Sequence, residues 1–80
     1  MMRDTVTILA FGKLTDVLPA RSEFSWKGGT MGDLREELEQ AFPELTGKTF
    51  NMALNHSMAP LDVQVSSGAE IALLPPFSGG

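Results

Sequence analysis

The pattern of apolar and polar residues predicts a strand near each end of the chain and one helix between them. Residues 5–11 alternate at first and then become continuously apolar, which is typical of a strand covered on both faces. Residues 70–74 form a nearly all-apolar run that stops at two prolines, which cannot donate to a sheet ladder. Because these two strands are the most apolar, we expect them to lie side by side in the centre of a sheet.

A helix is predicted for residues 31–41, where apolar side chains recur every three or four positions. Thr30 has the character of an N-cap, and Asp33 stands three residues later as its capping-box partner. Pro43 ends the helix, because the residue before a proline is pushed out of the helical region. The opposite face carries three carboxylates that we expect to lie in solvent: Glu36, Glu37 and Glu39.

Weaker strands complete the predicted domain at residues 23–26 and 50–55, with an edge-like segment at 61–65. Phe24 and Trp26 share one strand face, so we expect both in the core. We also expect three methionines to fill gaps in the core: Met31, Met52 and Met58. The order of elements predicts an α+β fold, in which one main helix packs on a mixed sheet of four or five strands. If the first and last strands are parallel, a right-handed crossover containing the helix joins them.

The length and composition of the chain limit its chemistry. Its 80 residues suit one small domain, which we place at residues 1–74 with a tail at 75–80. The chain has no cysteine, which excludes disulfides, thiolate zinc sites and a cysteine nucleophile. The one histidine, His56, reads as an exposed turn residue. We therefore expect neither a metal site nor a bound cofactor, and a complete enzyme active site within this chain is disfavoured.

Charge and hydropathy narrow the choice of partners. The formal net charge of −4 disfavours binding to nucleic acid and to anionic membrane surfaces. The first residues lack the basic start and apolar run of a signal peptide, and no stretch approaches the ~20 apolar residues of a membrane span. We therefore expect a cytoplasmic protein that works with other proteins.

The last six residues are the best candidate for function. Fully extended they reach roughly 20 Å, two prolines stiffen the root, and two glycines leave the tip without a Cβ. Such a tip can enter a channel too narrow for side chains. If a partner enzyme adenylates the terminal carboxylate, a sulfur or nitrogen nucleophile can attack it. Alone, a final Gly-Gly is more typical of a frayed end, but a Pro-Pro-x-x-Gly-Gly ending after a buried strand of a small helix-on-sheet domain favours a carrier. The six residues are Pro75, Pro76, Phe77, Ser78, Gly79 and Gly80.

Residues 73–80, which read LLPPFSGG, resemble the C-terminus of the MoaD family, the sulfur-carrier small subunits of molybdopterin synthase. The resemblance extends along nearly the whole chain. Residues 8–12 are similar to the family's first strand, 30–34 to its helix entry, 53–55 to a turn, and 68–72 to the step into the last strand. The resemblance implies the ubiquitin-like β-grasp fold, in agreement with the predicted order of elements.

The resemblance also implies a role for each residue of the tail. A ubiquitin-activating-type adenylyltransferase would use ATP to adenylate Gly80, and a sulfur donor protein would convert the adenylate to a thiocarboxylate. The large subunit of molybdopterin synthase, with which the family forms a heterotetramer, would then receive the tail. There the sulfur would pass to cyclic pyranopterin monophosphate. On this reading the chain is a non-catalytic carrier subunit, Gly79 gives backbone clearance, residues 75–78 line the inserted tail, and Phe11 contacts the large subunit.

Three other functions stay open. The chain could carry a thiocarboxylate for another pathway, as ThiS-like relatives do, although those relatives usually lack the two prolines found at Pro75 and Pro76. A ubiquitin-like modifier would begin with the same adenylation and end with an isopeptide bond to a lysine. A non-catalytic interaction domain would use its folded surface and leave the terminal glycines without a function.

Overall fold

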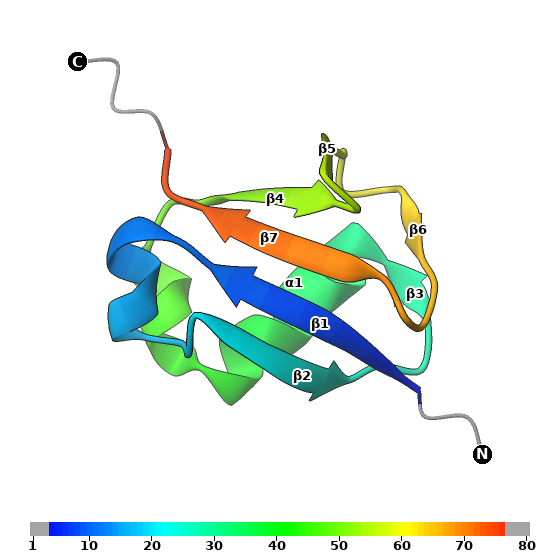
Figure 1. Cartoon of the computed structure of the whole chain (residues 1–80), viewed down its shortest axis with the longest axis horizontal. Coiled ribbons are helices and arrows are strands. Elements are labelled where there is room, and N and C mark those ends of the chain that lie inside the picture. The colour runs from blue at the N-terminus through cyan, green and yellow to red at the C-terminus, as the bar shows by residue number, and fades with distance from the viewer. Residues whose placement is uncertain (1–3, 77–80) are drawn as a thin grey trace.

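The computed structural model describes residues 4–76 and shows a mixed five-stranded sheet (Figure 1). The strand order is β2-β1-β7-β4-β5, in which β1 and β7 are parallel and every other neighbouring pair is antiparallel. The predicted adjacency of the first and last strands is therefore confirmed. The strands are β1 (Thr5–Ala10), β2 (Arg21–Ser25), β4 (Asn51–Leu54), β5 (Ser57–Met58) and β7 (Glu70–Leu74).

One helix, α1 (Met31–Ala41), covers one face of this sheet (Figure 1). Its predicted bounds are confirmed, because local chemistry fixes them. The Asp33 backbone N–H donates to Thr30 Oγ1 at 3.1 Å, and the Thr30 N–H donates to Asp33 Oδ2 at 3.0 Å, which completes the capping box. The helix buries Met31, Leu34 and Leu38 completely. Burial of each such side chain contributes roughly 1.5–3 kcal/mol.

The core lies between α1 and the sheet. On β1, the side chains of Val6, Ile8 and Ala10 are buried and alternate with half-buried ones, and β7 shows the same alternation. Trp26, directly after β2, is 1% exposed, and its indole Nε1 donates to the Val65 carbonyl at 2.9 Å. Among residues 4–76 no polar or charged residue is buried. The expected core role of Trp26 is thus confirmed, whereas Phe24 is only partly buried.

Two predicted connections contain short 3-10 helices. η1 (Gly12–Asp16) follows β1 and buries Leu14, and η2 (Pro43–Gly47) follows α1 and buries Leu45. Each element therefore contributes one apolar side chain to the core, although neither has an amphipathic stripe long enough to be recognised as a helix.

The predicted edge segment at 61–65 is largely wrong. Only Gln64–Val65 forms a strand, β6, and it pairs with β3 (Gly29–Thr30) in a separate two-stranded sheet. The segment before β6 instead accepts hydrogen bonds from the first N–H groups of α1. The Met31 N–H donates to the Val63 carbonyl and the Gly32 N–H donates to the Leu61 carbonyl, each at 2.8 Å.

The expectation for Met58 is also wrong. This side chain is 61% exposed, because it sits on β5, a two-residue strand at the edge of the sheet. The other two methionines, Met31 and Met52, are buried as expected.

Candidate functional site

The strand that leads into the C-terminal residues is paired on both sides. β7 pairs with β1 on one side and with β4 on the other, so that Leu73 lies opposite both Ala10 and Met52. The pairing continues beyond β1, where the Phe11 N–H donates to the Leu73 carbonyl at 3.2 Å. The end of β7 is therefore fixed on both sides, and the position where the chain leaves the sheet is fixed with it.

The chain leaves the sheet at two prolines that pack to different extents. Pro75 is half-buried and Pro76 is exposed. Neither has an N–H with which to continue the ladder, and the ring of each restricts its own φ. We call Pro75 and Pro76 the tail root. The rest of the predicted site, Phe77, Ser78, Gly79 and Gly80, lies outside the described residues.

A glycine after β1 lets the tail root approach the domain closely. Gly12 has φ +60°, a left-handed conformation, and a Cβ built on it would lie 2.9 Å from Pro75 Cγ. Both the conformation and the contact therefore favour glycine at this position. The sequence contained the signal for this contact, since a glycine follows the first central strand and a proline follows the last. Because β1 and β7 are parallel, the residues that follow the two strands lie at the same end of the sheet.

An apolar surface leads to the tail root on the sheet face that α1 does not cover. On this face the half-buried Leu9 lies opposite Ala72, and Leu74 follows two residues later on β7. Phe11, two residues beyond Leu9, is 45% exposed. We call Leu9, Phe11, Ala72 and Leu74 the apolar strip. Sequence reasoning singled out Phe11 alone, although the alternation along both strands also marks the other three.

The polar side chains at the other end of β7 have structural roles. Glu70 Oε1 lies 3.0 Å from His56 Nε2, and Glu70 Oε2 forms an ion pair with Arg21 at 3.9 Å. The His56 side chain is 83% exposed, as expected for a turn residue. Asn55 accepts a hydrogen bond from the Glu70 N–H at 2.9 Å and has φ +49°. This cluster holds the turn between β4 and β5 against the start of β7.

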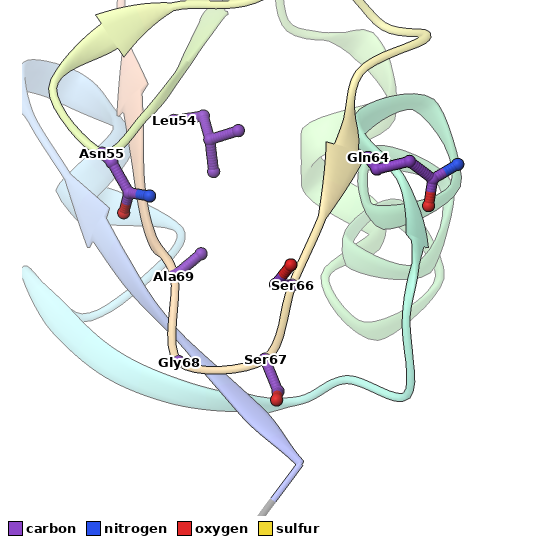
Figure 2. Close-up of a pocket in the computed structure, with 7 residues that line it drawn as sticks. All are labelled: Leu54, Asn55, Gln64, Ser66, Ser67, Gly68 and Ala69. Carbon is purple, nitrogen blue, oxygen red and sulfur yellow. The ribbon is translucent and has the colours of Figure 1, made fainter.

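A cavity of about 220 Å³ lies beside this cluster, between the β4–β5 turn and the turn before β7 (Figure 2). None of its lining side chains carries a charge. The start of β7 is one strand length, roughly 16 Å, from the tail root, so this cavity is not part of the tail site. Its lining residues are Leu54, Asn55, Gln64, Ser66, Ser67, Gly68 and Ala69.

Within residues 4–76, no group of three or more acidic, histidine or cysteine side chains could hold a metal ion. In the same part of the chain, no helix is long and apolar enough to cross a membrane.

The five-stranded mixed sheet, the single helix across one face and the central last strand define a ubiquitin-like β-grasp protein. The model of the ThiS family matches residues 8–80, and the chain belongs to this family. The predicted resemblance to sulfur-carrier proteins of the MoaD and ThiS type is therefore confirmed.

Individual relatives agree with this assignment. The molybdopterin synthase sulfur carrier subunit of Mycobacterium tuberculosis is 32% identical over 94% of this chain and 96% of its own length. The crystal structure of SAMP1 from Haloferax volcanii superposes with a TM-score of 0.80, is 26% identical, and covers 95% of this chain and 99% of its own. A putative molybdopterin converting factor subunit 1 from Pyrococcus furiosus shares the fold, with a TM-score of 0.83 at 18% identity, over 90% of this chain and 97% of its own.

Proposed function

We propose that this chain carries sulfur for the synthesis of molybdopterin, on its C-terminal Gly80. The observation that carries the proposal is the sequence Pro-Pro-Phe-Ser-Gly-Gly placed directly after the central strand β7, in a chain 32% identical to a molybdopterin synthase sulfur carrier subunit. The firmly held end of β7 and the contact of Pro75 with Gly12 support it, because they would present the following residues from a fixed point.

The proposed chemistry takes place in the active sites of partners. A ubiquitin-activating-type adenylyltransferase binds ATP, a carboxylate oxygen of Gly80 attacks the α-phosphorus, and pyrophosphate leaves. A donor protein then delivers sulfur at the oxidation level of sulfide to the acyl carbon, and AMP leaves. The resulting thiocarboxylate enters the active site of the molybdopterin synthase large subunit and gives its sulfur to cyclic pyranopterin monophosphate, while water restores the carboxylate.

In this proposal the residues of the chain bind and position. Gly79 and Gly80 pass through a channel too narrow for side chains, and Pro75, Pro76, Phe77 and Ser78 line the inserted segment. Phe11 and the rest of the apolar strip contact the large subunit, because the strip borders the tail root and contains the 45% exposed Phe11. The family's heterotetramer of two large and two small subunits is the assembly we expect.

The proposal is tested by the intact mass of the chain after incubation with its adenylyltransferase, ATP and a sulfur donor. We expect a gain equal to the replacement of one oxygen by sulfur, and no gain for a chain that lacks Gly80. No adduct on the wild-type chain, with an activating enzyme proved active on another carrier, would overturn the proposal. Restoration of molybdoenzyme activity in cells that lack their own small subunit would then identify the pathway.

A second candidate function is conjugation to lysines of target proteins. SAMP1, at 26% identity, is a small archaeal modifier protein by name. Adenylation of Gly80 would be the same, and the product would be an isopeptide bond between Gly80 and a lysine. Mass spectrometry of tryptic peptides separates the two functions, because a modifier leaves a C-terminal remnant of this chain on target lysines and a carrier does not.

A further inference from the structure

A second cavity, of about 320 Å³, opens at the end of the molecule from which the tail root leaves. Figure 1 shows the turn after β1 and the turn after α1 at this same end. We call this second cavity the end cavity. Its lining residues come from η1, from the residue after it, and from the junction of α1 with η2: Asp16, Val17, Ala41, Phe42, Pro43 and Glu44.

Part of the floor of the end cavity is apolar and continuous with the core. Val17 and Phe42 are partly buried and pack against the main hydrophobic cluster, and Pro43 lies beside them in the lining. Such a floor suits a hydrocarbon segment, because contact removes apolar surface from water on both partners.

The rim of the end cavity is negative. Asp16 and Glu44 are both exposed, and within the described part of the chain neither carboxylate has an ion-pair partner. The C-terminal end of α1 adds partial negative charge and has no basic residue in its last turn. Pro43 has no N–H, so it cannot donate to the carbonyl four residues before it. No lining residue of the cavity is basic.

We infer that the end cavity binds a lysine or arginine side chain of the protein that receives the tail. The aliphatic stem lies on Val17 and Phe42, and the cationic head lies between Asp16 and Glu44. A bare metal ion fits less well, because the lining offers only two carboxylates and the floor has no ligand atoms. The identity of this partner rests on the function proposed above, whereas the cation preference rests on the cavity alone.

The end cavity lies close enough to the tail root for one partner protein to contact both. Pro75 packs against Gly12 at the start of η1, and Asp16 is the last residue of the same element. Five residues of 3-10 helix span roughly 10 Å. A protein interface of ordinary size covers about 800 Å² of each partner, a patch roughly 30 Å across. A partner seated on the tail root can therefore also reach the end cavity.

The cation preference is tested on the full chain by amide chemical shifts, with N-acetyl-leucyl-arginine amide as the probe. Its citrulline analogue, which has nearly the same shape and no charge, is the control ligand. We expect the arginine probe to shift Val17, Phe42 and Glu44 and to bind roughly fivefold more tightly than citrulline, since each exposed ion pair contributes little. Equal binding of the two probes, or shifts confined to other residues, would overturn the inference.

Matched variants show whether the partner uses the cavity. The first double variant, Asp16→Asn with Glu44→Gln, removes both carboxylates of the cavity rim. The second, Glu23→Gln with Glu37→Gln, removes the same charge at exposed positions outside the cavity lining. We expect the first double variant to bind the molybdopterin synthase large subunit roughly fivefold more weakly than the second at low salt. This difference should shrink in about 1 M salt, where the Debye length is about 3 Å.

The outcomes separate the two proposals. If the wild-type chain binds the large subunit and both double variants bind equally well, the partner does not use the end cavity, and the proposed function is unaffected. If the wild-type chain does not bind the large subunit, the proposed function fails and the assignment of the side chain to that partner fails with it. The probe titration then decides the cation preference without reference to either partner.

Discussion

Replacement of Gly12 by alanine tests whether the tail root is held by the contact between Gly12 and Pro75. The left-handed conformation of Gly12 costs an alanine roughly 1–2 kcal/mol. The new Cβ would lie 2.9 Å from Pro75 Cγ, and relief of such overpacking costs about 1–3 kcal/mol more. We expect Gly12→Ala to lower the free energy of unfolding by about 2–5 kcal/mol. For a domain of this size each 1 kcal/mol corresponds to about 4–8 °C in Tm.

Two other glycines separate the backbone cost from the contact. Gly68 also has a positive φ, +85°, but a Cβ there meets nothing within 4 Å, so Gly68→Ala reports the backbone cost alone. A Cβ on Gly47 meets nothing either, and its φ is ordinary, so Gly47→Ala is expected to be neutral or to stabilise by about 0.4–1 kcal/mol. The predicted order of stability is therefore Gly47→Ala, then Gly68→Ala, then Gly12→Ala.

Pro75→Ala completes a double-mutant cycle with Gly12→Ala. Loss of Pro75 Cγ relieves the overpacking, so Gly12→Ala should cost about 1–2 kcal/mol less in the Pro75→Ala background. Urea unfolding followed by the fluorescence of the only tryptophan, Trp26, measures all of these variants, because this side chain is 1% exposed in the folded chain. If Gly12→Ala costs no more than Gly68→Ala and the coupling energy is near zero, the proposed anchoring of the root is refuted.

Three further predictions concern the helix, the apolar strip and the tail. Thr30→Ala should remove the capping box and lower the free energy of unfolding by about 1 kcal/mol, measured by urea unfolding; Thr30→Ser should keep most of it, and equal losses would contradict the capping role. Phe11→Ser should change stability by less than about 0.5 kcal/mol, because the side chain is exposed, and should weaken large-subunit binding at least fivefold by calorimetry. Unchanged affinity would remove Phe11 from the interface. One residue added after Gly80 should abolish sulfur loading, seen by intact mass, with Tm unchanged; loading of the longer chain would contradict a terminal carboxylate as the carrier.

The parts of the fold that depend on local chemistry could be predicted from the sequence. The bounds of α1 follow from Thr30, Asp33 and Pro43, which act within a few residues of themselves. The central place of β7 was correctly predicted from its run of apolar residues, although the expected cover on both faces is wrong, because α1 covers one face and Ala72 and Leu74 stay half-buried on the other. In both cases the controlling residues lie within the element itself.

Other parts, which depend on contacts between distant segments that no apolar pattern marks, could not be predicted from the sequence. Residues 61–63 read as strand, but their carbonyls are used by the start of α1, which no local pattern reveals. Met58 reads as core because it is apolar, yet the short β5 leaves it without cover. The candidate functional residues also fall into a part that was predicted from the sequence and a part that was not. The tail was evident from its own residues, whereas the end cavity brings together residues 16–17 and 41–44, which become neighbours only in the folded chain.

The pairing of β7 on both sides has a mechanical consequence. A partner that draws the tail into its active site pulls on β7 along the strand axis. Because hydrogen-bond ladders to β1 and β4 run along both edges of this strand, such a force loads the two ladders in shear, and many bonds must break together. An edge strand such as β2 has one ladder alone to resist the same force. If the chain works as proposed, the domain therefore resists traction along β7 while a partner inserts and withdraws the residues that follow it.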